Sequence, residues 1–333
     1  MNKPLVSIII PCFNRENYLP ETIESCLEQT HSNLEIIVAD DGSTDGSVTV
    51  AKQYAQQDDR VKVFHTVNQG PCVARNNGLG LSQGIYVKFL DSDDVLLPYS
   101  IEYQVDSLEH YQVDLTSGKI LGFFDGGLPQ AKQEVPSSLS FTEEDKPLNE
   151  PYLNLIQKIP LTFNEVLLKR EIAYQSGGFH PWLGGANESS LNARILCNFP
   201  HAKATFHQDT VVLLKRLGDY SLAATNRQSK ETLPWALISY QKSGEYALKR
   251  SDKLTPEVKH FIFDRLYKLA IYAYRQNKKG YALTALEVWQ KANVQPPLLA
   301  PWYHNMLHHY GGFIQAEETL ERMRRLASPF RST

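Results

Sequence analysis

The sequence has few cysteines, little net charge and no long hydrophobic run. Its four cysteines among 333 residues, Cys12, Cys26, Cys72 and Cys197, show no metal-binding or redox spacing, so we expect reduced, buried thiols. The net charge of −3 provides no basic field, which argues against nucleic acid as a partner. No apolar run reaches the roughly 18 residues that a transmembrane helix needs. The start of the chain lacks the cleavage region of a signal peptide, so we expect a cytoplasmic protein.

The first hundred residues alternate between apolar and amphipathic segments. The pattern predicts strands at 5–10, 34–39, 61–65 and 85–90, and helices at 18–29, 47–57 and 71–83. Nearly continuous apolar strands separated by short helices are typical of a mostly parallel sheet that helices cover on both faces. The sequence therefore predicts an α/β fold, in which ligands bind outside the carboxyl ends of the strands.

Three of the predicted strands end in polar residues. Residues 11–14 (PCFN) follow the first strand, residues 40–41 (DD) the second, and residues 91–94 (DSDD) the fourth. Because the carboxyl ends of parallel strands share one edge of a sheet, we expect these residues to converge on one crevice. Asp91 and Asp93 are two positions apart, so they point to the same side of an extended segment. Together with substrate phosphates they suit a divalent cation, whereas an isolated D-x-D is more often a solvated acidic turn.

Four segments, in this order, resemble the successive signatures of family 2 glycosyltransferases: 5–14 (LVSIIIPCFN), 40–45 (DDGSTD), 74–78 (ARNNG) and 89–94 (FLDSDD). The resemblance continues weakly through 169–171 and 177–179 and covers about the first 215 to 225 residues. It implies a GT-A fold, a nucleotide-diphosphate sugar as donor, a hydroxyl on a carbohydrate or lipid-linked acceptor, and Mn²⁺ or Mg²⁺ as cofactor.

The resemblance implies roles at the first two strand ends. Pro11, Phe13 and Asn14 would line the nucleotide-sugar pocket. Asp41 would accept a hydrogen bond from the base edge, as a uracil-reading carboxylate does in relatives. Arg75 would lie near the nucleotide. A UDP-sugar is therefore the favoured donor, and dTDP- and GDP-sugars stay open.

The resemblance also implies the metal site. Asp93 would be the direct metal ligand, Asp91 would lie nearer the ribose and complete the pair, and Asp94 would be an alternative or additional ligand. A histidine that relatives often carry downstream, near the diphosphate, has no counterpart here. Lys215 or Arg216 would contact phosphate in its place; the alternative is a basic strand end.

The general base is the least regular part of the resemblance. In the family this base is usually the Asp of a Glu-Asp pair shortly after a Gly-Gly-Phe. Here the pair reads Asn187-Glu188, so Glu188 stands in the place of the Asp. Glu is chemically competent but reaches about one methylene further, and the geometry of a base matters before its pKa. The alternative is that Glu188 is a first-turn helix carboxylate, which the helix dipole favours.

The length predicts two domains. The extent of the resemblance and the change to helical segments near residue 225 place them at 1–225, a catalytic domain by resemblance, and at 226–333, a helical extension. Polar, loop-like residues at 119–160 would face the acceptor, unless they are a disordered insertion. Helices are predicted at 233–248, 256–277, 280–292, 301–310 and 314–326. They fit either a bundle or an imperfect tetratricopeptide-like array, because only two weak copies are visible.

The resemblance implies an inverting, metal-dependent glycosyltransferase of cell-surface polysaccharide or lipopolysaccharide synthesis. The competing prediction is a catalytically impaired GT-A protein that binds nucleotide sugar while its helical part recruits partners. That helical part could also mediate self-association or contact the inner membrane face, for which the basic residues of 322–331 are candidates. A solvated helix face is the simpler interpretation of those residues.

Overall fold

The computed structural model describes residues 3–124, 148–158, 162–181, 187–217, 232–292 and 294. Its elements, in chain order, are β1 (Val6–Cys12), α1 (Leu19–Leu27), β2 (Leu34–Asp40), α2 (Ser47–Gln57), β3 (Val61–His65), α3 (Pro71–Leu81), β4 (Tyr86–Phe89), β5 (Val95–Leu96), α4 (Ser100–Tyr111), β6 (Leu115–Phe123), β7 (Leu148–Pro151), α5 (Tyr152–Lys158), β8 (Leu167–Lys169), α6 (Arg170–Gln175), α7 (Asn187–Asn198), β9 (Lys203–Arg216), α9 (Thr232–Leu248), α10 (Pro256–Arg275) and α11 (Lys279–Lys291).

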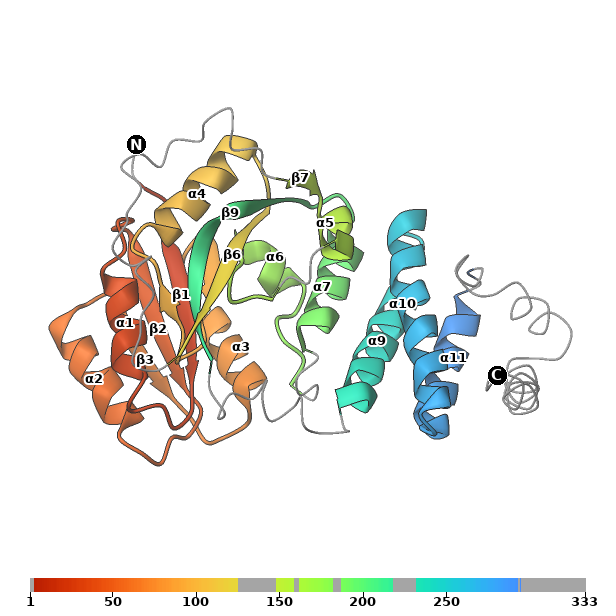
Figure 1. Ribbon diagram of the computed structural model, residues 1–333, viewed down its shortest axis with the longest axis horizontal. Coiled ribbons are helices and arrows are strands. Elements are labelled where there is room, and N and C mark those ends of the chain that lie inside the picture. The colour runs from red at the N-terminus through yellow and green to blue at the C-terminus, as the bar shows by residue number, and fades with distance from the viewer. Residues whose placement is uncertain are drawn as a thin grey trace, which may run out of the picture.

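One twisted sheet organises the first two thirds of the chain (Figure 1). β1 pairs in parallel with β2 and β4, and β3 continues this half beyond β2. β8 then pairs antiparallel with both β4 and β6. β9 runs parallel to β6, whereas β5 and β7 pair with β9 antiparallel. The predicted parallel order is confirmed for the first four predicted strands, and the sheet as a whole is mixed.

Alternate residues of β1 pack on opposite faces of the sheet, as successive strand side chains must. Ile8 and Ile10 belong to a hydrophobic cluster that includes residues of α1 and α4. Ile9 instead packs in the cluster that contains Leu79 of α3. All seven residues of β1 are buried, which explains why the strand reads as a nearly continuous apolar run.

The register of the parallel strands aligns their polar ends. Cys12 of β1 is paired with Asp40 of β2, and Ile9 is paired with Phe89 of β4. The residues that follow β1, β2 and β4 therefore emerge at the same edge of the sheet. This edge is where the sequence predicts the ligand site.

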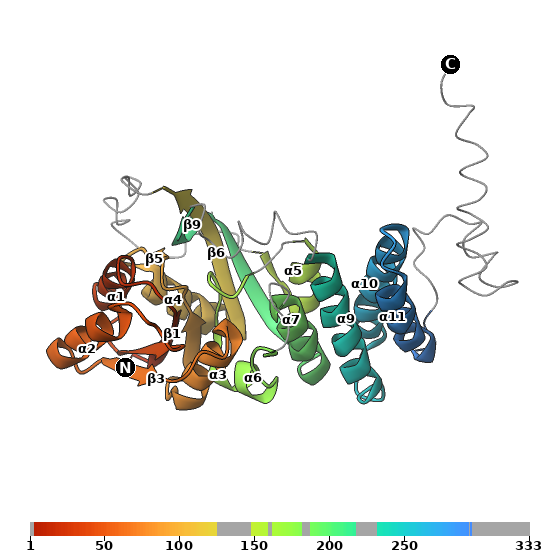
Figure 2. The ribbon, with the colours of Figure 1, turned by 90° about the horizontal axis from the view of Figure 1, so that it is seen from below.

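Beyond α7, the helices α9, α10 and α11 pack against one another on the side away from α1 and α2 (Figure 2). Their hydrophobic residues join the cluster that contains Leu191 of α7, so α7 connects the sheet to this helical part. The three helices confirm the first three predicted there; the predicted helices at 301–310 and 314–326 lie outside the described residues. So do the domain boundary at 225/226 and most of 119–160. None of the described helices has both the length and the apolar character needed to cross a bilayer.

Candidate active site

Phe13 and Asn14 follow β1 at the carboxyl edge of the sheet. Pro11 is buried within the strand, whereas Phe13 is 42% exposed. Asn14 has a φ of 52°, a left-handed conformation that Asn tolerates better than most residues. Its Oδ1 accepts a hydrogen bond of 2.8 Å from the Thr44 N–H, which fastens the loop after β1 to the loop after β2. Phe13 thus offers aromatic surface at this edge, while the Asn14 side chain binds within the protein.

Asp41 is buried and holds the turn that begins α3. Its Oδ1 accepts a hydrogen bond from the Gln69 N–H and its Oδ2 accepts one from the Gly70 N–H, each at 2.7 Å. Gly70 has a φ of 95°, which favours glycine at this turn. Each carboxylate oxygen retains a second lone pair. Asp41 thus has acceptor capacity left for a uracil edge, and that contact stays a prediction.

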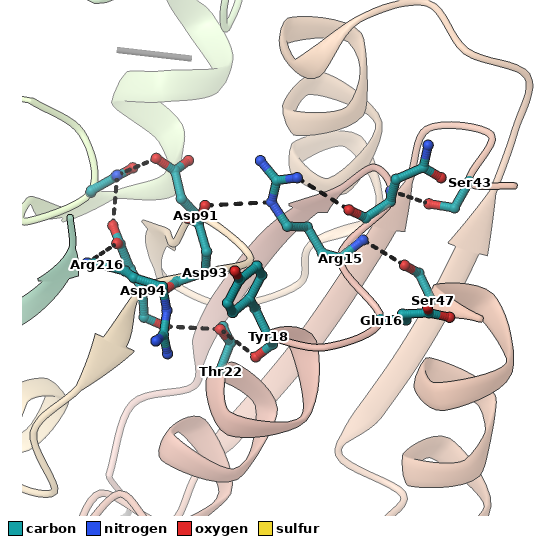
Figure 3. Close-up of polar contacts among 12 residues, drawn as sticks. Arg15, Glu16, Tyr18, Thr22, Ser43, Ser47, Asp91, Asp93, Asp94 and Arg216 are labelled. Atoms are coloured by element: carbon teal, nitrogen blue, oxygen red, sulfur yellow. Dashed lines mark hydrogen bonds and ion pairs between the residues drawn. The ribbon is translucent and has the colours of Figure 1, made fainter. Parts of the chain in front are cut away.

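Asp91, Asp93 and Asp94 form one acidic turn after β4 (Figure 3). Asp91 Oδ1 pairs with Arg75 at 2.6 Å, and Asp91 Oδ2 accepts a hydrogen bond of 2.5 Å from Asn164 Nδ2. The same Nδ2 lies 3.3 Å from Asp94 Oδ2. The other carboxylate oxygen of Asp94 accepts a hydrogen bond of 3.0 Å from a backbone N–H of β9. Two of the three carboxylates are therefore held by protein donors.

Asp93 differs from its two neighbours in how it is held. Its Oδ2 lies 3.4 Å from Arg15 Nε, a long ion pair that reaches across from the loop after β1 (Figure 3). Burial and the nearby Asp91 raise the pKa of Asp93 above its ordinary value. Burial and Asp91 also raise the pKa of Asp94, well above the ordinary range. Burial is the largest cause of both rises, because it disfavours the charged form of a carboxyl group.

Burial alone would raise the pKa of Asp91 as well. Arg75 and Lys215 outweigh burial, and they hold the pKa of Asp91 below its ordinary value. The charged form of Asp91 is therefore stabilised by two cations and by a side-chain amide.

This turn suits a divalent cation that takes only one or two of its ligands from the protein. Within the described ranges, no three Asp, Glu, His or Cys side chains are grouped as a closed metal site requires. Mg²⁺ is commonly bound through one or two carboxylates, with phosphates and waters completing its coordination. Asp93, with its long ion pair and raised pKa, has the chemistry for such an open site. The ligand roles of Asp91, Asp93 and Asp94 stay predictions.

Two cations share this site with the carboxylates. Arg75 of α3 pairs with Asp91, and its guanidinium lies 5.3 Å above the centre of the Phe179 ring. Burial would lower the pKa of Lys215 in β9, but Asp94 and the other nearby carboxylates raise it above its ordinary value. Both side chains therefore remain charged and could attract a diphosphate.

Arg216 is held by different neighbours. Its guanidinium lies over the rings of Tyr18 and Phe123, at 4.9 and 4.6 Å from their centres. It also pairs with Glu21, and its Nε donates a hydrogen bond of 3.1 Å to the backbone carbonyl of Asp93. Arg216 thus supports the acidic turn from β9, and its contact with phosphate stays a prediction.

Glu188 lies in the first turn of α7. Its Oε1 accepts a hydrogen bond of 3.2 Å from the Phe163 N–H. Burial raises the pKa of Glu188 to about 7, although the positive charge of Arg75 opposes this rise. The negative charge of Asp91 adds to the rise, and Arg75 interacts electrostatically with both Asp91 and Glu188. A carboxyl group with a pKa close to neutral is suited to general base catalysis.

Asn164 and Arg15 were missed in the sequence. Asn164 lies 73 residues after Asp91 and belongs to none of the motifs. Arg15 directly follows the first motif, and its charge was the only available signal. Both contacts depend on tertiary structure, which residue spacing does not reveal.

The mixed sheet with flanking helices is that of GT-A glycosyltransferases. The family model described as "Glycosyl transferase family 2" matches residues 7–173, and the chain belongs to this family.

Two curated relatives each match about a third of the chain. An "Uncharacterized glycosyltransferase" of Haemophilus influenzae is 46% identical over 119 residues, which is 35% of this chain and 48% of that protein. The "Putative teichuronic acid biosynthesis glycosyltransferase TuaG" of Bacillus subtilis is 44% identical over 105 residues, or 31% of this chain and 42% of that protein. The chain thus matches less than half the length of either relative.

Solved structures share the fold over nearly the whole chain. S. aureus TarS 1-349 in complex with UDP-GlcNAc has a TM-score of 0.69 at 18% identity, covering 97% of this chain and 92% of that one. The mannosyltransferase PcManGT from Pyrobaculum calidifontis, in complex with GDP-Man and Mn²⁺, has a TM-score of 0.55 at 18% identity and covers 99% and 83%.

Proposed function

We propose that this chain is an inverting, metal-dependent glycosyltransferase that transfers a sugar from a UDP-sugar to an acceptor hydroxyl. The observation that carries the proposal is the ion pair of Arg75 with Asp91 at 2.6 Å. The positive charge of the same Arg75 also opposes the rise in the pKa of Glu188. One cation therefore interacts with both the proposed donor-binding turn and the proposed base, which supports a single active site. The nucleotide-sugar complexes of TarS and PcManGT support the donor class.

In the proposed reaction, Glu188 accepts the proton of the acceptor hydroxyl. The hydroxyl oxygen then bonds to the anomeric carbon of the donor sugar, and the bond from that carbon to the diphosphate oxygen breaks. The bonding electrons stay with the nucleoside diphosphate, whose charge Lys215 and Arg75 would offset. A divalent cation held by Asp93 would stabilise the same leaving charge as a Lewis acid.

The proposed setting is cell-surface polysaccharide or lipopolysaccharide synthesis, with a carbohydrate or lipid-linked acceptor. The similarity to TuaG, named for teichuronic acid biosynthesis, supports a polysaccharide. The test is a panel of nucleotide sugars with Mn²⁺, scored by release of nucleoside diphosphate and by sugar transfer. We expect one UDP-sugar to be turned over, with EDTA abolishing turnover. No turnover of any donor by the wild-type chain would contradict the proposal.

A second candidate is a nucleotide-sugar-binding protein without transfer. The Phe163–Glu188 hydrogen bond favours it, because a carboxylate in a first helical turn that accepts a backbone N–H can serve structure alone. The two candidates differ in metal-stimulated UDP release, which a binding protein lacks even where UDP itself binds.

A further inference from the structure

The segment 162–165 contacts both the acidic turn after β4 and the candidate base Glu188. Asn164 donates hydrogen bonds to the acidic turn, as described above. The adjacent Phe163 N–H donates to Glu188 Oε1 at 3.2 Å. Two neighbouring residues therefore connect the carboxylates of the predicted metal site with the candidate base.

The Asn164 amide is placed to fix two carboxylates at once. Asn164 is 4% exposed, and its Nδ2 lies 2.5 Å from Asp91 Oδ2 and 3.3 Å from Asp94 Oδ2. An amide NH₂ carries two hydrogens, so one side chain can serve both acceptors. Without this donor, the two buried carboxyl groups would lose the side chain that holds them side by side, and their relative orientation would no longer be fixed.

The segment that carries Asn164 is itself anchored. Glu165 Oε1 accepts a hydrogen bond of 2.7 Å from the Thr162 N–H, which closes the segment on itself. The Glu165 carbonyl accepts a hydrogen bond of 2.7 Å from Gln104 Nε2, and Gln104 Oε1 in turn accepts one of 3.1 Å from the buried Lys88. Buried polar networks of this kind rigidify the groups that they hold.

Aromatic packing adds a second anchor on the other side. The Phe163 ring packs edge-on against Phe89, the last residue of β4, and against Phe179, over which Arg75 lies. Asn164 therefore extends from a fixed point, and its amide cannot drift without disturbing several buried contacts.

We propose that Asn164 is a positioning residue, which orients Asp91 and Asp94 so that the acidic turn binds a divalent cation together with the donor diphosphate. This inference rests on the proposed function, because it assigns Asn164 to the donor site of that reaction. Asn164 itself contacts neither substrate nor metal in this account.

The test measures Mn²⁺ affinity in the presence of saturating UDP, by electron paramagnetic resonance of free Mn²⁺. Asn164→Ala is compared with Val166→Ala, which trims a buried side chain two residues further on and removes no polar contact. Hydrogen-bond partners of metal-binding groups typically contribute 10- to 100-fold in affinity, so we expect Asn164→Ala to bind Mn²⁺ about tenfold more weakly. Val166→Ala should bind Mn²⁺ as the wild type does, although its melting temperature falls.

Asn164→Ser provides a second reading if the alanine variant does not fold. Its single hydroxyl hydrogen cannot serve two carboxylates, so the same weakening of Mn²⁺ binding is expected. Wild-type Mn²⁺ affinity in a folded Asn164 variant would overturn the inference, as would equal weakening in Val166→Ala. Absence of Mn²⁺ and UDP binding by the wild type would instead overturn the proposed function, and the inference with it.

Discussion

Replacing Glu188 by Gln keeps the shape of this side chain and removes its ability to accept a proton. Burial raises the pKa of Glu188 from 4.5 to about 7. At about 1.4 kcal/mol per pKa unit, the difference of roughly 2.5 corresponds to about 3 kcal/mol. That free energy measures how strongly the folded protein prefers the protonated carboxyl, and it predicts effects on both stability and rate.

For stability, the folded state keeps a proton between pH 4.5 and about 7 that the unfolded state releases. The contribution of Glu188 therefore becomes less favourable as the pH rises through this window, and the full cost of about 3 kcal/mol applies above it. Glu188→Gln has no such cost. We expect the variant to exceed the wild type in free energy of unfolding at pH 8 and to lose this advantage near pH 4.5, as measured by urea denaturation at several pH values.

For rate, a base must be deprotonated, so wild-type kcat should rise with pH and level off above about 7. Glu188→Gln should lower kcat by about 100-fold or more. The reasoning is refuted if the variant transfers sugar at the wild-type rate. It is also refuted if the stability difference between the two proteins is independent of pH.

Three further predictions address the rest of the site. Asp93→Asn should weaken Mn²⁺ binding in the presence of UDP by at least about tenfold in calorimetry, and unchanged affinity would assign the cation to other ligands. Phe13→Ala should weaken UDP binding by about 1–3 kcal/mol if the exposed ring stacks on the base, and equal affinity in a fluorescence titration would contradict stacking. Gly178 has a φ of 59°, and a Cβ there would lie 2.3 Å from Asn76 Oδ1, which accepts a hydrogen bond from the Phe179 N–H. Gly178→Ala should therefore destabilise the fold by about 1–3 kcal/mol, and an unchanged urea midpoint would argue against this strain.

The parallel half of the fold was predictable because β1, β2 and β4 are buried along their whole length and therefore read as nearly continuous apolar runs. α2 spans Ser47–Gln57 and β3 spans Val61–His65, as their hydrophobic patterns predict. The convergence of the polar strand ends followed from parallel pairing alone. The short antiparallel strands β5 and β8 were not predicted, since two or three residues carry no usable periodicity.

Within the site, the carboxylates could be found in the sequence but their partners could not. Asp91, Asp93 and Asp94 stand out because three acidic residues follow an apolar strand. Asn164 and Arg15 acquire their roles only when distant segments meet, and neither residue type is unusual in its local surroundings.

A crystal structure of the chain with UDP and Mn²⁺ tests the central claim most directly. We expect the cation to bind oxygen atoms of Asp93 and of both phosphates at about 2.1 Å, close to the distances of a hard divalent cation. The uracil ring of UDP should lie beside Phe13. A nucleotide bound away from the carboxyl edge of the sheet, or a cation without any of the three aspartates as ligand, would contradict the account.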